Sequence, residues 1–286
     1  MSALDHELAG RGIVELVDVF TDDFVTSWNF ALDVLFAATG EQARSYVGAD
    51  VLAELGLLGS LFTPKVRAVL NAIYGAEPIV LYHCHVYEIE GGQRHPHIQR
   101  RQLDGWHRDI ETLEHFRLDE PEYVSIFTYL TDVGDDGGPF EFVPQPPLRH
   151  PTTGSPCVTV VGPAGFTFAW NRSYFHRAAP NRSPERRRVL KLSVQPARLP
   201  HDRLDGVEFR RAREMTTGDS FVHGLFGGDT RGDRTELSIV DTPYRPLIPN
   251  RSVDVSGGDV AAYNALRAGR YLRRRARAFN ARTRPS

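Results

Sequence analysis

Residues 122–143, EYVSIFTYLTDVGDDGGPFEFV, contain two short apolar runs joined by a turn rich in glycine and aspartate. Short apolar or alternating runs bounded by such turns are typical of β-strands. Runs of the same kind lie on both sides of this stretch: IVLYHCHVYEI, CVTVV, GFTFAW and RVLKLSV. We therefore expect a β-sandwich or β-barrel over residues 80–196.

The part of the chain before this region has helical spacing. Residues 12–20 predict a short strand, and Thr21 is a plausible N-cap of a helix that ends at Gly40. Further helices are expected over residues 50–59 and 64–75. Helices followed by many short strands indicate an α+β protein in which the N-terminal helices pack on one sheet.

The part of the chain after residue 196 is less regular. Residues 197–250 are polar and predict loops, and an arginine-rich helix is expected from about Asp259 as a helical C-terminal extension. The simplest interpretation of its charges is a solvated helix face. We predict a single domain over residues 1–286, made of a strand and helices (12–79), a core (80–196) and an extension (197–286).

The bulk composition excludes several classes of protein. The chain has 286 residues, a net charge of −2 and 41% hydrophobic residues, which favours one large globular domain and does not suggest nucleic acid as a partner. The two cysteines, Cys84 and Cys157, argue against a disulfide scaffold. No apolar run approaches the roughly 20 residues of a membrane span. We expect a cytoplasmic protein with no membrane partner, and nothing indicates its oligomeric state.

The segment GWHRDIE, residues 105–111, suggests a metal site. If it forms a strand, His107 and Asp109 lie on one face because they are two residues apart. His176, 69 residues beyond His107, is the best candidate for a third ligand. Two imidazoles and one carboxylate are the ligand set of non-haem Fe(II) oxygenases, which leaves three positions for a bidentate cosubstrate and O2.

Such enzymes mostly use 2-oxoglutarate, whose far carboxylate needs a fixed cation. In ERRRVLKLSV, strand alternation directs Leu190, Leu192 and Val194 toward the helices. Arg187 then shares the opposite, inner face with Val189 and Ser193, where its planar guanidinium suits a carboxylate. Arg186 and Arg188 have the parity of the apolar face and are expected to reach solvent.

Other residues have two open interpretations. Trp106, Trp170 and Phe140 could line a substrate pocket, although large aromatic residues are more often core packing. The basic loop at residues 93–101 could attract an anionic substrate, but a solvated loop is the simpler interpretation. A non-catalytic barrel that binds a metal or a small molecule is the alternative to an enzyme. The remaining histidines considered are not expected to be ligands: His85, His95, His97, His115 and His150.

Four segments in order carry a resemblance to a known family: GIVELVDVFTDDFV, WHRDIE, FTYLTDVGDDGGPFEFVPQPP and HRAAPNRSPERRR. Over residues 12–195 the chain resembles the Fe(II)- and 2-oxoglutarate-dependent dioxygenases of the phytanoyl-CoA dioxygenase type, which include ectoine hydroxylase. The resemblance implies a jelly-roll barrel, or double-stranded β-helix, of the cupin type. It also implies iron on His107, Asp109 and His176, with O2 as cosubstrate.

The resemblance extends to the cosubstrate. The family's 2-oxoglutarate arginine lies about eleven residues beyond the distal histidine, which selects Arg187, and His83 stands where ectoine hydroxylases carry a glutamine near the cosubstrate. The implied activity is hydroxylation of a small-molecule substrate, and halogenation is disfavoured because Asp109 is present. Residues 144–147, PQPP, replace the family's usual PGSH, so the substrate does not transfer. The arginine-rich, lysine-poor composition suggests a GC-rich bacterial genome and a role in secondary metabolism.

Overall fold

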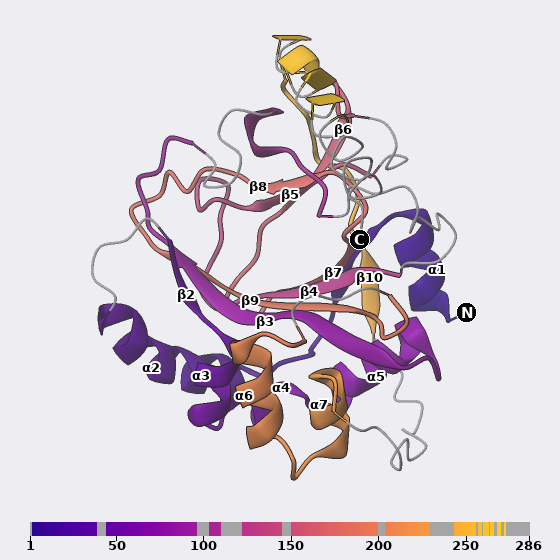
Figure 1. Cartoon of the computed structure of the whole chain (residues 1–286). Coiled ribbons are helices and arrows are strands. Elements are labelled where there is room, and N and C mark those ends of the chain that lie inside the picture. The colour runs from indigo at the N-terminus through magenta and orange to yellow at the C-terminus, as the bar shows by residue number, and fades with distance from the viewer. Residues whose placement is uncertain are drawn as a thin grey trace, which may run out of the picture.

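The computed structural model describes residues 2–38, 44–95, 103–109, 122–144, 150–199, 204–228 and 243–255, with scattered positions between 257 and 272. Two antiparallel sheets face each other across an aromatic core, and most of the helices cover the outer face of the larger sheet (Figure 1). This is the α+β, double-stranded β-helix architecture expected from the sequence. None of the helices in the described residues is long and apolar enough to cross a membrane.

The larger sheet has seven strands in the order β10-β1-β7-β4-β9-β3-β2, all antiparallel. β3 and β9 form its longest strand pair, with a register shift between Leu81 and His83. The strands are β1 (Ile13–Leu16), β2 (Arg44–Val47), β3 (Ile79–Ile89), β4 (Val124–Tyr129), β7 (Thr167–Asn171), β9 (Arg187–Pro196) and β10 (Tyr244–Pro246).

The smaller sheet has the order β11-β6-β5-β8. Beside β8, His107 forms an isolated antiparallel bridge with His176, so the segment around His107 lies next to this sheet's edge. The strands are β5 (Phe140–Phe142), β6 (Pro156–Val160), β8 (His176–Ala178) and β11 (Arg251–Ser252).

The helices begin where the sequence offers caps. Thr21 Oγ1 accepts from Phe24 N at the start of α2, and Thr63 caps α5, which has Pro64 in its first turn. The helix expected over residues 50–59 is instead two short helices, separated at Gly56, whose φ is +71°. The helices are α1 (Ala3–Gly10), α2 (Asp22–Ala38), α3 (Ala49–Glu54), α4 (Leu57–Leu61), α5 (Pro64–Tyr74), α6 (Val207–Met215) and α7 (Ser220–Leu225).

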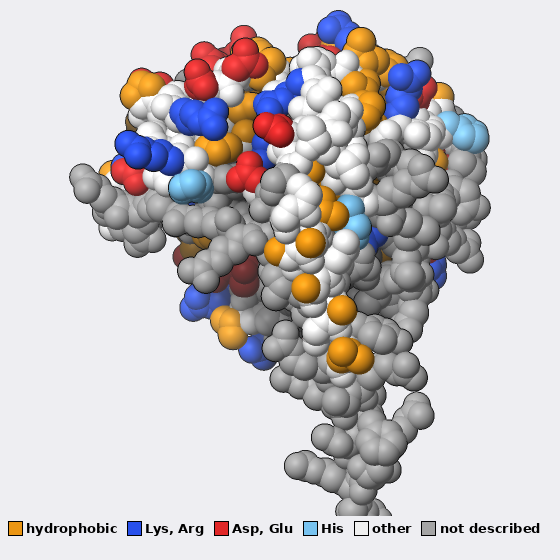
Figure 2. Space-filling model, turned by 90° about the horizontal axis from the view of Figure 1, so that it is seen from above, with side chains coloured by type: hydrophobic (Ala, Val, Ile, Leu, Met, Phe, Trp, Pro, Cys, Tyr) orange, Lys and Arg blue, Asp and Glu red, His pale blue; other side chains and the backbone are white. Residues whose placement is uncertain are grey.

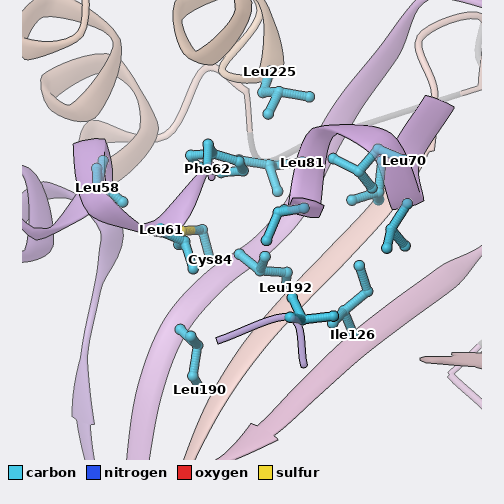
Figure 3. Packing of buried hydrophobic residues seen from close by; sticks show 14 of the residues in the cluster. Leu58, Leu61, Phe62, Leu70, Leu81, Cys84, Ile126, Leu190, Leu192 and Leu225 are labelled. Carbon is cyan, nitrogen blue, oxygen red and sulfur yellow. The ribbon is translucent and has the colours of Figure 1, made fainter. Parts of the chain in front are cut away.

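The main hydrophobic core lies between the large sheet and these helices (Figure 3). Leu190 and Leu192 of β9 point into it, together with Leu81 and Cys84 of β3. Val189, the residue before Leu190 on β9, belongs to a second core between the two sheets. The alternation expected for β9 is therefore present, and the inner face of the large sheet is the face that meets the smaller sheet.

Two expectations for the fold are wrong. Residues 197–250 are not all loop, because α6 and α7 pack beneath the sheet and β10 extends it beside β1. The sequence hides α6, since only Phe209 and Ala212 of its nine residues are buried. Arg188 does not reach solvent: it is 6% exposed and pairs with Glu88 beneath the sheet. The C-terminal extension is helical at the described positions between residues 257 and 272, and Asp259 lies outside the described residues.

Candidate metal centre

Three side chains from two distant segments of the chain meet beside β8, the edge strand of the smaller sheet. The Nε2 atom of His107 lies 3.8 Å from Oδ1 of Asp109, and Nε2 of His176 lies 3.7 Å from the same oxygen. The ligand atoms of the three residues all lie within 4.8 Å of one another. The structure thus brings together the three ligands expected from the sequence, although the described residues 103–109 form a short 3-10 turn and a single bridge rather than a regular strand.

Both imidazoles are oriented by backbone carbonyls. His107 Nδ1 lies 2.7 Å from the carbonyl oxygen of Gly105, and His176 Nδ1 lies 3.0 Å from that of Tyr174. A carbonyl can only accept, so each Nδ1 carries the proton and each Nε2 presents a lone pair. Burial, together with the neighbouring His176, lowers the pKa of His107 to about 4, so this imidazole is neutral at pH 7.

Asp109 is held as a carboxylate by two cations. Its Oδ2 accepts from Arg172 Nε at 3.0 Å and lies 3.6 Å from Lys191 Nζ. Burial alone would raise the pKa of Asp109, but Lys191 and Arg172 hold it well below its usual range. Oδ1 therefore stays available, negatively charged, on the side of the two imidazoles.

The donor set fits a first-row divalent metal. Donor atoms about 2.1 Å from one ion lie about 3 Å apart when they are at right angles. The measured separations of 3.7 and 3.8 Å need to shorten by less than about 1 Å. Two neutral imidazole nitrogens and one carboxylate oxygen on one side of an ion are the facial set typical of non-haem Fe(II).

The turn that carries His107 is unusual in its backbone. Leu103, Asp104 and Gly105 have φ values of +48°, +47° and +88°, which places them in the left-handed region. Arg177 holds this turn, because its Nη1 donates to the carbonyl oxygen of Asp104 at 2.8 Å and to its carboxylate at 2.6 Å. The carbonyl oxygen of Gly105, at the end of this turn, accepts the hydrogen bond from His107 Nδ1. The left-handed backbone conformations therefore occur in the turn that orients the imidazole of His107.

Arg187 lies on the inner face of β9 and is 2% exposed. Its Nη1 donates to the carbonyl oxygen of Gly138 and its Nη2 to Tyr87 Oη at 3.2 Å. Its Nε is buried and has no hydrogen-bond partner among the described residues. A fixed guanidinium with a spare buried donor, on the inner face of the strand whose Lys191 lies beside Asp109, suits a dicarboxylate.

His83 also lies on the inner face, but away from Arg187. Its Nδ1 is 3.0 Å from Ser193 Oγ, which in turn is 2.7 Å from Ser125 Oγ. Burial, with the nearby Lys191, lowers the pKa of His83 well below its usual range, so the ring is neutral. Ser193 is six residues along β9 from Arg187, so His83 lies toward the metal end of this strand.

The three aromatic candidates lie in different places. The Trp170 ring centroid is 4.1 Å from that of His176, and Phe140 stacks on His176 at 5.6 Å. Both rings pack against the ligand and are fully or nearly fully buried. The structure does not bring Trp106 to the centre. It belongs to a third hydrophobic cluster with Phe175, and Arg177 lies over its ring.

The remaining candidates are not part of the metal cluster. His85 lies on the inner face opposite Lys191, His150 packs edge-on to Phe175, and His95 is exposed. His97, His115 and all of the basic loop beyond residue 95 lie outside the described residues.

Sequence reasoning missed two charged residues at the centre. Lys191 has the same strand parity as Val189 and Ser193, so alternation along β9 could have placed it on the inner face. Arg172 follows β7 directly and gives no such signal, because its contact with Asp109 depends on how two distant loops meet.

Several solved structures share this fold. The carbocyclase SnoK from nogalamycin biosynthesis, described as non-haem and α-ketoglutarate-dependent, has 17% identity and a TM-score of 0.52 over 69% of this chain and 85% of its own. HygX from Streptomyces hygroscopicus, with nickel and 2-oxoglutarate bound, has 15% identity and a TM-score of 0.51 over 68% and 86%. EctD from S. alaskensis, with 2-oxoglutarate and 5-hydroxyectoine, has 17% identity and a TM-score of 0.51 over 66% and 74%. At these identities the likeness is one of fold.

The fold and the donor set together define a class of protein, the Fe(II)- and 2-oxoglutarate-dependent oxygenases. The family model for phytanoyl-CoA dioxygenase (PhyH) matches residues 39–189, which is more than half of the chain. The chain therefore belongs to the phytanoyl-CoA dioxygenase family and is an enzyme of this oxygenase superfamily, with iron and 2-oxoglutarate as its cofactors. No curated protein matches the sequence.

Proposed function

We propose that the protein oxidises an unactivated C–H bond of a small-molecule substrate, with hydroxylation as the outcome. The balanced reaction joins one oxygen atom of O2 to the substrate carbon, while the other enters succinate as 2-oxoglutarate loses CO2. The observation that carries this proposal is the convergence of two Nε2 atoms on Asp109 Oδ1, with Arg187 buried on β9, the strand whose Lys191 lies beside Asp109.

Each residue has a separate task in this reaction. His107 and His176 bind the metal as neutral donors held by backbone carbonyls, and Asp109 is the anionic ligand. Arg187 binds the far carboxylate of the cosubstrate through its spare donor. Bound iron supplies the activation of O2 once the cosubstrate is in place.

The aromatic residues beside the ligands keep water away from them. Trp170 and Phe140 cover the ring of His176. The ring centroid of Phe127 lies 5.4 Å from the centroid of each of these two aromatic rings. Exclusion of water protects a reactive centre from side reactions. Cyclisation, as in the carbocyclase SnoK, differs from hydroxylation only in the step that follows C–H cleavage, and product analysis separates the two outcomes.

The test is succinate formation from 2-oxoglutarate by the Fe(II)-loaded protein in air, without substrate. We expect slow turnover in the wild type, none in Asp109→Ala, and a KM for 2-oxoglutarate raised about tenfold or more in Arg187→Met. A charge-assisted hydrogen bond is worth about 1.5–3 kcal/mol, which corresponds to that factor. Arg245→Met, at an exposed position on β10, is the control and should behave as wild type.

A second measurement makes the test independent of turnover. Anaerobic titration of the Fe(II) protein with 2-oxoglutarate should produce a visible absorption band, which Asp109→Ala loses. Absence of both succinate and the band in the wild type would overturn the proposal and favour a non-catalytic binding protein.

A further inference from the structure

Lys191 is a buried lysine beside the metal ligands. It lies on the inner face of β9, opposite His85 of β3, and its side chain is 14% exposed. Its ammonium is 5.5 Å from the Phe127 ring centroid and 3.6 Å from Asp109 Oδ2, which is longer than a hydrogen bond. An ammonium has three donors, and the one anionic partner recorded for Lys191 in the described part of the chain is this Asp109 carboxylate.

Asp109 has a second and closer cationic partner besides this lysine. Arg172, 3% exposed at its side chain, already donates from Nε to the same oxygen at 3.0 Å. The second oxygen of Asp109 faces the two histidines. Lys191 and Arg172 are therefore two cations beside a single carboxylate charge. A buried positive charge in excess of its anionic partners is costly.

Among the groups that the structure describes, the charges around the centre do not balance without another anion. Iron(II), the Asp109 carboxylate, dianionic 2-oxoglutarate and Arg187 sum to zero. The charged groups that act on Lys191 are Asp109, Arg172 and Arg44, and two of these three are cations. Arg172 Nη1 and Arg44 Nε are also buried without a hydrogen-bond partner among the described residues.

This positive charge is internal. The face seen in Figure 2 mixes acidic and basic side chains, whereas the cations near Asp109 line the inner face of the large sheet. Positive charge placed beside the reacting centre selects what binds there, and a buried cation gains most from an anion that replaces its lost hydration.

We propose that Lys191, backed by Arg172, is a carboxylate-binding subsite for the substrate, so that the enzyme acts on a small carboxylic acid. This inference rests on the proposed function. Since Lys191 touches a metal ligand, the acid group lies close to the metal. The carbon that is oxidised is then within a few bonds of the carboxylate.

The probes are matched pairs of an acid and its primary amide: phenylacetate and phenylacetamide, 3-phenylpropionate and its amide, hexanoate and hexanamide. Binding is measured by calorimetry on the anaerobic Fe(II) protein with 2-oxoglutarate bound. We expect at least one acid to bind at least tenfold more tightly than its amide. That preference should be lost in Lys191→Met and kept in Lys191→Arg and in Lys65→Met, which changes the only other lysine.

The other anion that could use Lys191 is the metal-bound end of 2-oxoglutarate itself. Anaerobic titration of the absorption band separates the two sources. We expect Lys191→Met to lose much less affinity for 2-oxoglutarate than Arg187→Met does, because Arg172 still donates to Asp109 in the lysine variant. A loss in Lys191→Met as large as that in Arg187→Met would assign the lysine to the cosubstrate and overturn the proposal.

Other outcomes also overturn it: no acid binds, an amide binds as well as its acid, or the preference survives Lys191→Met. The wild-type comparison of acid with amide stands even if that variant does not fold. If the proposed function is wrong, the Fe(II) protein gives no absorption band with 2-oxoglutarate. The preference for an acid over its amide is measured independently of this band, because it can also be measured on the metal-free protein.

Discussion

Arg188 is a charged side chain inside the apolar layer between the large sheet and the helices. Its guanidinium bonds twice to Glu88 Oε2, at 2.7 and 3.1 Å, and also reaches Asn29 and Asp33 of α2. It lies over the ring of Phe36 as well, 4.9 Å from the centroid. The pair joins β9 to β3 and α2 just beside Arg187, so it fixes the strand end that carries the cosubstrate arginine.

We expect Glu88→Gln to lower the free energy of unfolding by about 3 kcal/mol, because Arg188 loses its buried carboxylate and keeps only the exposed Asp33 as a charged partner. The double variant Glu88→Met/Arg188→Met should recover most of this loss, since two apolar side chains of similar length can replace a buried pair. Urea unfolding of both proteins measures the two values.

Arg186→Met is the matched control, because Arg186 bonds to the same glutamate from a side chain that is 45% exposed. An exposed pair contributes about 1 kcal/mol or less, so this variant should be nearly as stable as wild type. Equal destabilisation by Glu88→Gln and Arg186→Met would contradict the buried pair as the source of stability.

At the scale of elements, the turn between β4 and β5 supports the cosubstrate arginine. Gly138 has a φ of +71°, and its carbonyl oxygen accepts from Arg187 Nη1. A Cβ on Gly138 would lie 3.0 Å from the Ala179 carbonyl oxygen and 3.0 Å from Asn181 Cβ. The turn can keep its conformation and its contact with Arg187 only with glycine at this position.

We predict that Gly138→Ala both destabilises the protein and weakens 2-oxoglutarate binding. A left-handed alanine costs about 1–2 kcal/mol, and the steric contacts add to it and move the carbonyl. Gly154→Ala is the control, because Gly154 has a φ of +87° and a Cβ added there would meet no described atom within 4 Å. It should lose stability without losing 2-oxoglutarate affinity.

The measurements are urea unfolding and anaerobic titration of the 2-oxoglutarate band. If Gly138→Ala and Gly154→Ala had the same stability and the same affinity for 2-oxoglutarate, the turn would have no part in positioning Arg187.

The elements that the sequence predicted well are those whose pattern is local. α5 has a cap, an N-terminal proline and five buried residues at helical spacing, and β9 alternates cleanly. α6 and α7 were missed because α6 is mostly charged and α7 has six residues, so tertiary contacts rather than local pattern select them. The short strands β10 and β11 are likewise selected by sheet edges far away in the chain.

At the scale of the whole molecule, the convergence of His107, Asp109 and His176 could be predicted because iron chemistry restricts the residue types and the family fixes their order. Lys191 and Arg172 could not be placed at the centre in the same way. Their role depends on β7, β9 and the segment carrying Asp109 meeting in space, which neither spacing nor composition encodes. The shared family site is thus readable in sequence, whereas the residues proposed to select the substrate required the structure.

The two buried cysteines make the free energy of unfolding of the whole protein depend on pH. Cys84 lies in the core beneath the helices and Cys157 in the cluster on the outer side of the smaller sheet. Burial raises the pKa of Cys157 to about 12 and also raises that of Cys84, whereas thiols in an unfolded chain ionise near about 8.5. Above that pH the unfolded state loses protons that the folded state keeps. Each thiol then lowers the free energy of unfolding by up to about 1.4 kcal/mol per pH unit.

We therefore expect the stability difference between wild type and Cys84→Ala/Cys157→Ala to shrink by at least about 2 kcal/mol between pH 7 and pH 10. The comparison uses urea unfolding of the metal-free proteins. Lys191, whose pKa burial lowers to about 8, acts in the opposite direction, but it does so in both proteins and cancels from the difference. The single variants assign the effect to each thiol. A difference that stays constant with pH would mean that both thiols ionise in the folded protein, as they would if both cores opened to solvent without global unfolding.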